Sequence, residues 1–191
     1  MQLLEQRILA EGKNLGQGIL KVDSFINHQV DAELMMACGI EFGKVFSNVG
    51  ANKIFTCEIS GIAPALMTGW QLKLPVVYAR KTKPITMPDI VFMTTAPSHT
   101  KKRDVEIMAS PEYLRQGDKV LIIDDFLATG MTILALVRIA QAAGCEVVGI
   151  GTLVEKTFEN GRDALRHLKI PVHALARIKS MSDGRIEFER D

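Results

Sequence analysis

The sequence predicts an α/β protein whose mostly parallel, twisted sheet carries helices on both faces. Apolar, strand-like segments alternate with helix-like segments from residue 53 to residue 178, which is the pattern of a parallel sheet. The length of 191 residues suits one domain, and no internal repeat or low-complexity stretch divides the chain. We therefore expect a single domain over 1–191, with an α/β core over 51–178.

Residues 1–50 precede this core. Apolar residues at Leu4, Ile8 and Leu9, followed by Gly12, predict a short amphipathic helix in "LLEQRILAEG". The mixed segment "GILKVDSFINHQVD" predicts a short strand and then a loop. Asp31 is a favourable N-cap for a second helix, "AELMMACGIEFGKVF".

The first half of the core begins with predicted strands at 53–59 and 75–79. Between them, "SGIAPALMTGWQL" predicts a turn and a helix whose first turn can hold Pro64. Residues 80–89 are basic and contain prolines, so they predict a loop. Two further strands, "IVFMTT" and "RDVEIMA", are joined by "APSHTKK" and form an expected hairpin.

The second half of the core repeats the alternation. "QGDKVLIID" predicts a turn and a strand, and "MTILALVRIAQAAG" predicts a helix that Gly144 ends. The remaining expected elements are a strand in "CEVVGIGTLVEK", a short helix in "GRDALRHL", a strand in "VHALARI" and an exposed last strand in "GRIEFER".

The bulk composition excludes several classes of protein. A net charge of +1, with 47% hydrophobic and 24% charged residues, gives no field that would attract nucleic acid or a membrane surface. No apolar run reaches membrane-spanning length, and the charges in "MQLLEQRILAEGK" exclude a signal peptide. The three cysteines and four histidines lack zinc-site spacing. We expect a cytoplasmic protein with reduced thiols and no metal ion held directly by protein ligands.

The segment "VLIIDDFLATGMT", residues 120–132, places two aspartates at the end of an apolar strand, just before a turn and a helix. In open parallel sheets, ligands bind at the carboxyl ends of the strands. Polar residues that follow three other predicted strands are Ser60 and Gly61, Arg80 and Lys81, and Glu155 and Lys156. We expect all these positions to converge on one edge of the sheet.

Residues 128–132 predict a phosphate-binding turn. They are Ala128, Thr129, Gly130, Met131 and Thr132. The amides of a helix's first turn are unpaired and partly positive, glycine allows close approach of an anion, and threonine hydroxyls can donate. The chain contains neither GxxxxGK[ST] nor GxGxxG, so this turn is neither a Walker loop nor a dinucleotide-binding loop.

A phosphate alone would repel Asp124 and Asp125, so the ligand must carry other groups that need acceptors. The 2- and 3-hydroxyls of a ribose 5-phosphate are such groups, and the carboxylates would also face positive charge that develops on the sugar. The alternative is that the two aspartates only cap a loop. The length of the combined pattern disfavours that alternative.

The segment resembles the signature of the type I phosphoribosyltransferases, which bind phosphoribosyl diphosphate (PRPP). Within that family, nearly the whole chain is similar to the bacterial xanthine phosphoribosyltransferases. The similar stretches are "LKVDSFINHQVD", "SGIAPA", "VVYARK", "IIDDFLATG", "GIGTLVEKTFENGRD" and "LARI". The chain departs from the pattern at Ile59, where relatives often have a polar residue.

The resemblance implies an enzyme of purine salvage that joins N9 of xanthine to C1 of PRPP, releases diphosphate and forms xanthosine 5′-monophosphate. It also implies a homodimer, and Mg²⁺ held mainly by PRPP oxygens. Asp124 and Asp125 would be the catalytic residues. PRPP would be bound by residues 128–132 together with Ser60, Gly61, Arg80 and Lys81.

The resemblance implies a base site as well. Residues 1–50 would contribute a hood over the base, with Leu20 and Asn27 contacting it. Lys156 would donate to the 6-oxo group, and Phe158 would stack on the ring. The tip "APSHTKK" resembles a mobile loop that covers the family's active site.

Several alternatives stay open from the residues. The basic run that begins at Arg80 can be a solvated loop, Phe158 can be a core residue, and Asn27 can cap a loop. The same reaction can use guanine, hypoxanthine or adenine. A PRPP-sensing regulator would keep the PRPP turn, but here neither a basic face nor a helix-turn-helix precedes the core.

Overall fold

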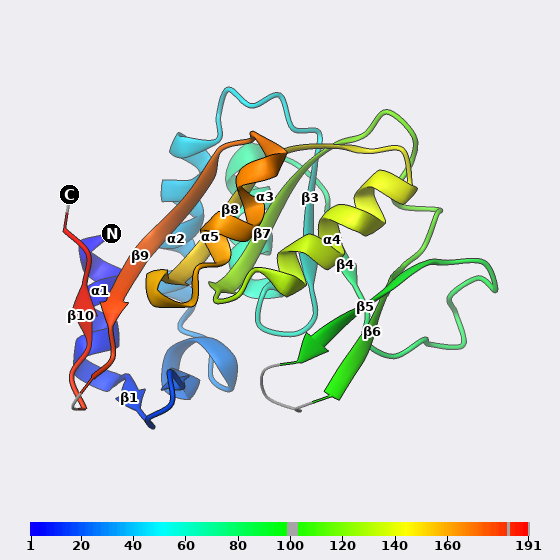
Figure 1. Ribbon diagram of the computed structural model, residues 1–191. Coiled ribbons are helices and arrows are strands. Elements are labelled where there is room, and N and C mark those ends of the chain that lie inside the picture. Colours follow the sequence, from blue (N-terminus) through cyan, green and yellow to red (C-terminus); the bar gives the residue numbers. More distant parts are fainter. Residues whose placement is uncertain (99–102, 183, 191) are drawn as a thin grey trace.

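The computed structural model describes residues 1–98, 103–182 and 184–190 (Figure 1). Its centre is a six-stranded sheet in the order β10-β9-β8-β7-β3-β4. The strands are β3 (Lys53–Cys57), β4 (Val76–Ala79), β7 (Lys119–Leu127), β8 (Glu146–Lys156), β9 (Val172–Ser180) and β10 (Glu187–Phe188). All neighbours pair in parallel except β10, which is antiparallel to β9. The prediction of a mostly parallel sheet is confirmed.

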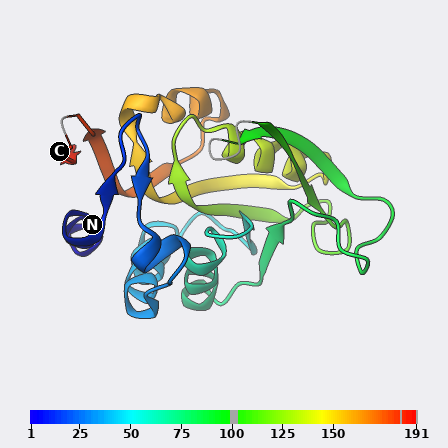
Figure 2. The same ribbon diagram turned by 90° about the horizontal axis from the view of Figure 1, so that it is seen from below.

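Helices cover both faces of this sheet, as predicted (Figure 2). One face carries α2 (Ala32–Val45) and α3 (Ile62–Leu72), and the other carries α4 (Met131–Ala142) and α5 (Gly161–Leu165). In β7, Leu121 and Ile123 belong to the core under α2 and α3, whereas Val120 and Ile122 belong to the core under α4. A strand buried on both faces needs apolar residues at successive positions, which explains the apolar run.

Local signals account for several element boundaries. Oδ1 of Asp31 accepts a hydrogen bond from the Leu34 amide at 2.9 Å and so caps α2, as predicted. The first helix, α1 (Gln2–Glu11), ends at Gly12. Gly144, with a φ of +72°, closes the turn after α4. None of the helices in the described ranges combines the length and the apolarity that crossing a membrane requires.

Two hairpins lie beside the central sheet. One joins β1 (Lys13–Asn14) to β2 (Leu20–Lys21), and the other joins β5 (Phe92–Ser98) to β6 (Arg103–Ala109). Arg138 of α4 donates hydrogen bonds to the Thr94 hydroxyl and the Thr95 carbonyl, which attaches the second hairpin to α4. Within the predicted loop "APSHTKK", residues 99–102 lie outside the described residues.

Several segments differ from the sequence-based prediction: β1 was not expected, and β3 ends at Cys57 and not at residue 59. Asp23–Asn27 forms one π-helical turn, η1, and not a loop, and this turn buries the adjacent Phe25 and Ile26. Strand β7 does not end at the two aspartates but continues to Leu127, because its last residues still pair with β8. Single 3₁₀ turns also follow β8 and α5: η2 (Thr157–Glu159) and η3 (Arg166–Leu168).

Candidate active site

The segments predicted to form the site leave the sheet at one edge. The parallel register pairs Cys57 with Ala79 and Leu127 with Glu155. The residues that follow β3, β4, β7 and β8 are therefore neighbours. In Figure 1 the N-terminal segment (blue) and the β5–β6 hairpin (green) flank this edge.

Asp124 is buried at this edge, with 5% of its surface exposed. Its Oδ1 accepts a hydrogen bond from the Asp125 amide at 3.0 Å. Gly61 lies so close that a Cβ built on it would stand 2.4 Å from the same oxygen. Burial and the charge of Asp125 raise the pKa of Asp124 well above its ordinary value, and the charge of Lys81 opposes part of this rise. Asp124 thus keeps its proton to a higher pH than an exposed aspartate does, and Lys81 lies within electrostatic reach of it.

Asp125 differs from its neighbour because it is half-buried. Its Oδ1 accepts a hydrogen bond from the Phe126 amide at 2.9 Å, which fixes the carboxylate against the backbone. A buried acid beside a more accessible carboxylate gives this edge one group that resists ionisation and one that can accept hydrogen bonds from a ligand.

The turn at 128–132 has the backbone of an anion site. Gly130 is the N-cap of α4 and has a φ of +81°, a conformation that favours glycine. Gly130 has no side chain to cap this helix, and the first-turn amides of a helix can bind an anion. Gly161 packs against the turn: a Cβ built there would lie 2.1 Å from the Ala128 carbonyl oxygen and 2.9 Å from the Gly130 nitrogen. The turn therefore requires a glycine at 161 as well as at 130.

Glu58 joins the segments that follow β3 and β4. Its Oε2 lies 2.8 Å from Arg80 Nε, and its Oε1 accepts a hydrogen bond from the Lys81 amide at 2.6 Å. Ser60 and Gly61 follow two residues later and lead into α3. Arg80 is thus fixed by its own chain and is not part of a simple solvated loop, whereas the Lys81 side chain is exposed.

Lys156 brings the N-terminal hairpin to the end of β8. Its Nζ donates to the Gly18 carbonyl at 2.6 Å and to Glu159 Oε1 at 3.2 Å. The same nitrogen lies 5.6 Å from the centre of the Phe126 ring. Gly18 also touches Phe158, since a Cβ built on Gly18 would lie 3.4 Å from Phe158 Cε2. The turn between β1 and β2 therefore covers Lys156.

The other predicted base contacts lie in or near this hairpin. The side chain of Leu20 is buried in the core, which leaves its backbone as the part that can meet a ligand. Asn27 is exposed at the end of η1. Phe158 has 39% of its surface exposed, so the alternative that it is a core residue is excluded.

An ion-pair cluster around Glu155 holds α5 to the sheet. Glu155 is 2% exposed, and Arg162 donates to its two carboxylate oxygens at 2.8 and 2.5 Å. Arg177 of β9 donates to the same carboxylate at 3.3 Å. The hydrogen bonds that Arg162 donates to Glu155 raise the pKa of Arg162. Because Arg162 directly follows Gly161, the cluster fixes the start of α5 against the 128–132 turn.

Replacing Arg162 by Met should lower the free energy of unfolding by about 3 kcal/mol, because it leaves the buried Glu155 with Arg177 alone. Urea unfolding of the two proteins measures the difference. The matched control is Arg166→Met, which removes an exposed pair with Asp163 and should cost less than about 1 kcal/mol. Equal losses in the two variants would show that Glu155 does not depend on Arg162.

Two other features bear on ligand binding. Among the described residues, no group of three or more His, Cys, Asp or Glu side chains is placed to hold a metal ion.

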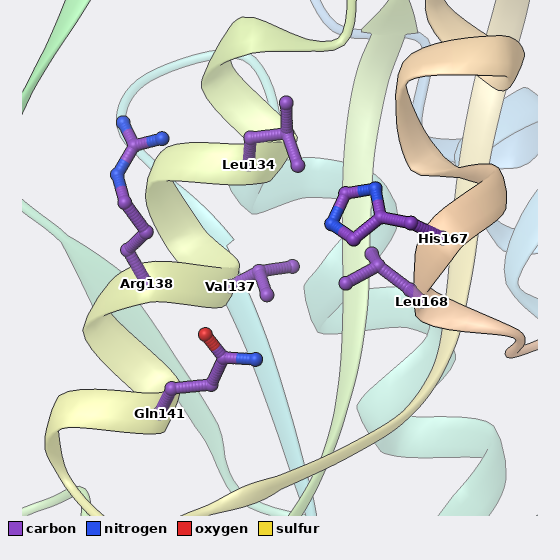
Figure 3. Close-up of a pocket in the computed structure, with 6 residues that line it drawn as sticks. All are labelled: Leu134, Val137, Arg138, Gln141, His167 and Leu168. Carbon is purple, nitrogen blue, oxygen red and sulfur yellow. The ribbon is translucent and has the colours of Figure 1, made fainter.

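A hollow of about 650 Å³ lies between α4 and η3 (Figure 3), and its lining residues are Leu134, Val137, Arg138, Gln141, His167 and Leu168. These residues do not include any of the predicted site residues, so the hollow is separate from the edge described above.

Sequence reasoning gave no role to the residues that support the site, although it expected one of them, Glu155, at the same edge. They are Gly18, Glu58, Phe126, Glu155, Glu159, Gly161 and Arg162. Most act through a partner that packing supplies, so periodicity and spacing do not mark them. Four of them lie within "GIGTLVEKTFENGRD", and the family resemblance of that stretch is the one signal that could have found them.

Comparisons with known proteins show the family of this chain. A model of the "Phosphoribosyl transferase domain" family matches residues 47–184. The xanthine phosphoribosyltransferase of Oceanobacillus iheyensis is 48% identical over 191 residues, which cover 100% of this chain and 98% of that protein. The xanthine phosphoribosyltransferase of Pediococcus pentosaceus is 47% identical over 190 residues, which cover 99% and 100% of the two chains.

A solved structure shows the same fold. The crystal structure of an APRTase from Giardia lamblia with 9-deazaadenine has a TM-score of 0.76 at 21% identity, with 93% of this chain and 98% of that chain covered. The region that matches the family model contains β3, β4, β7, β8 and the 128–132 turn, and the relatives match over nearly their whole length. The chain therefore belongs to the phosphoribosyltransferase family.

Proposed function

We propose that this protein is a cytoplasmic enzyme of purine salvage that transfers the phosphoribosyl group of PRPP to N9 of xanthine. The products are xanthosine 5′-monophosphate and diphosphate. The observation that carries the proposal is the pairing of β7 with β8. Because of this pairing, the two aspartates and the 128–132 turn lie beside Lys156. Groups suited to a sugar phosphate thereby lie next to a group suited to a base. The two bacterial relatives compared above carry the name of this reaction.

In this proposal the sugar phosphate binds along the end of β7. The amides of residues 128–132 hold the 5-phosphate at the start of α4. Asp124 and Asp125 bind the ribose hydroxyls, and the more accessible carboxylate of Asp125 stabilises the oxocarbenium character of the sugar as diphosphate leaves. Positioning and charge stabilisation, rather than covalent catalysis, lower the barrier.

Mg²⁺ fits this arrangement as an ion that arrives with PRPP. The half-buried carboxylate of Asp125 is a hard oxygen donor of the kind that Mg²⁺ prefers. When bound, the ion would neutralise charge on the leaving diphosphate. Most of its ligands would be substrate oxygens and water, because Mg²⁺ rarely occupies a cage made of protein groups alone.

The diphosphate is proposed to lie between the segments that follow β3 and β4. Ser60 and the amides around Gly61 face it from the start of α3, and Arg80 and Lys81 supply positive charge. Glu58 holds the backbone of Lys81 and the guanidinium of Arg80. This ordering keeps the cations near the site before the substrate binds.

A homodimer is proposed to form through the outer face of α3. Leu66 and Trp70, one turn apart, are 52% and 66% exposed, and Ile59 just before the helix is 77% exposed. Such neighbouring apolar side chains are typical of an association surface. Trp70→Glu should therefore shift the sedimenting species from dimer to monomer, while Leu9→Glu on α1, a residue 58% exposed, should not. If the Trp70→Glu protein still sediments as a dimer, the interface lies elsewhere.

The base is proposed to bind between the end of β8 and the N-terminal hood. Lys156 donates to the purine 6-oxo group, and Phe158 stacks on the ring. The hood belongs to residues 1–50, of which the β1–β2 hairpin touches Lys156 and Phe158. Asn27 and the backbone of Leu20 are proposed to read the 2-oxo group, which distinguishes xanthine from hypoxanthine and guanine.

Asp124→Asn should raise the melting temperature at pH 7 while it impairs turnover. The pKa of Asp124 in the folded state is raised above the ordinary 3.8 that it has in the unfolded chain. At a pH between 3.8 and the raised pKa, the folded state therefore holds a proton that the unfolded state has released. Stability therefore falls as the pH rises through this window. Asparagine does not titrate, and its Oδ1 can still accept from the Asp125 amide.

Calorimetry at pH 7, 5 and 4 measures this effect. The advantage of Asp124→Asn should shrink as the pH approaches 4, whereas Asp104→Asn, a change of an exposed aspartate on β6, should show no such trend. A variant that is less stable than wild type at pH 7 would contradict the raised pKa of the buried Asp124.

The proposed function is tested by one activity screen. The purified protein is supplied with PRPP and Mg²⁺ and with xanthine, guanine, hypoxanthine, adenine or uracil. The expected result is nucleotide formation with xanthine as the preferred base. Preference for guanine or adenine would overturn the assignment of the base, and absence of nucleotide with every base would overturn the transferase proposal.

A further inference from the structure

The ammonium group of Lys156 is shared by two parts of the chain. It donates to the carbonyl of Gly18, 138 residues away in the turn between β1 and β2, at 2.6 Å. It also donates to the carboxylate of Glu159, three residues later in η2, at 3.2 Å. The first bond reaches the β1–β2 turn of the N-terminal segment, and the second joins the end of β8 to the η2 turn that follows it.

The surroundings restrict this ammonium group. The side chains of Lys156 and Glu159 are only 13% and 19% exposed, and the Phe126 ring lies 5.6 Å from the nitrogen. Gly18 has a φ of +73° and packs against Phe158, which fixes the direction of its carbonyl. The two partners therefore determine how Lys156 is oriented, with little help from solvent.

An ammonium group has three N–H donors, arranged as a tetrahedron around the nitrogen. The described contacts engage two of them, and fixing two directions also fixes the third. A ligand carbonyl can then meet a donor that is already aimed. A ligand amino group would meet the same donor, and the ammonium could not rotate away without losing one of its two partners.

We propose that Glu159 is a positioning residue that orients the third N–H of Lys156 toward the 6-oxo group of the base, and that the Gly18 carbonyl ties hood closure to the same ammonium group. This inference rests on the proposed function, because it needs a 6-oxopurine at Lys156. It assigns discrimination between 6-oxo and 6-amino purines to the pair Lys156–Glu159 rather than to Lys156 alone.

The test compares Glu159→Ala and Glu159→Gln with wild type. Glu159→Ala should raise KM for xanthine about 10-fold, the effect expected for losing one charge-assisted hydrogen bond. The KM for PRPP should stay within about 2-fold, because Glu159 has no role in the sugar site. The ratio of kcat/KM for xanthine to that for adenine should fall. Glu159→Gln keeps a carbonyl acceptor and should recover part of both losses.

Hydrogen exchange supplies a readout that does not depend on turnover. Amides of residues 13–22 should exchange faster in Glu159→Ala than in wild type, because a freely rotating ammonium binds the Gly18 carbonyl less well. The matched control is Glu41→Ala, which also removes a carboxylate bonded to a lysine three residues away, Lys44, at 3.1 Å. That control should change neither the exchange nor KM.

Unchanged xanthine KM and unchanged exchange of residues 13–22 in Glu159→Ala would overturn the inference. A loss that Glu159→Gln does not recover in any part would do the same, since it would point to a general structural defect. Failure of the proposed function has a different signature: the wild-type protein would not prefer a 6-oxopurine over adenine.

Discussion

Replacing Asp125 by Asn is expected to lower turnover by at least about 10²-fold, the usual cost of removing one electrostatic stabiliser from a transition state. The change removes a negative charge and keeps the shape. Oδ1 of Asp125 accepts from the Phe126 amide at 2.9 Å, and an asparagine oxygen can accept the same bond. Folding should therefore be nearly unaffected, and the loss should fall on kcat.

Steady-state kinetics with xanthine and PRPP, together with a melting curve, test this expectation. Asp104→Asn, on the exposed side of β6, makes the same chemical change outside the site and should leave both measurements unchanged. Near-normal turnover in Asp125→Asn would remove Asp125 from the catalytic residues. A large fall in melting temperature would assign it a structural role.

Lys156→Ala is expected to lower kcat/KM by about 10²-fold for every 6-oxopurine, because a hydrogen bond from a charged donor to the 6-oxo group is lost. Use of adenine should fall much less, since its 6-amino group has no such bond to lose. The variant also leaves the Gly18 carbonyl and Glu159 without their shared partner. Kinetics with xanthine, guanine, hypoxanthine and adenine measure the pattern, with Lys44→Ala as the control for loss of a lysine ion pair.

Asn27→Ala gives the contrasting result within the same experiment. Lys156 reads a group that xanthine, guanine and hypoxanthine share, so it cannot choose among them. If the exposed Asn27 binds the 2-oxo group, Asn27→Ala should mainly lower kcat/KM for xanthine. The ratio of kcat/KM for xanthine to that for guanine should therefore fall. An equal loss of kcat/KM for every base in Asn27→Ala would show that Asn27 only shapes the hood. Unchanged kcat/KM for the 6-oxopurines in Lys156→Ala would show that Lys156 does not bind the base.

Much of the fold follows from local patterns. The alternation of apolar strands with amphipathic helices predicts a covered parallel sheet, and Asp31 caps α2 as its side chain allows. The prediction erred where local chemistry was outweighed by packing. Two adjacent carboxylates do not favour a strand, yet β7 runs through them to Leu127 because β8 still supplies hydrogen-bond partners there.

Less of the site was predictable. Strand-end positions and the 128–132 turn with its single glycine could be placed in sequence because a helix start and a close backbone approach have local signatures. The roles given to individual side chains came from resemblance to a family. The supporting residues had no local signature, since Gly161 matters only through its contact with the turn and Glu155 only through Arg162 and Arg177.

The sequence by itself determined the order of strands and helices along the chain and the presence of a turn with a glycine at a helix start, just after two aspartates. Those features depend on side-chain periodicity and on backbone preferences within a few residues of each other. Only the tertiary structure decided that Lys156 lies against Gly18, that Arg80 pairs with Glu58, and that the pKa of Asp124 is raised. The physical reason is that burial and distance between residues remote in sequence arise when the sheet and its helices pack together, and these quantities set the charge and the partners of each group in the site.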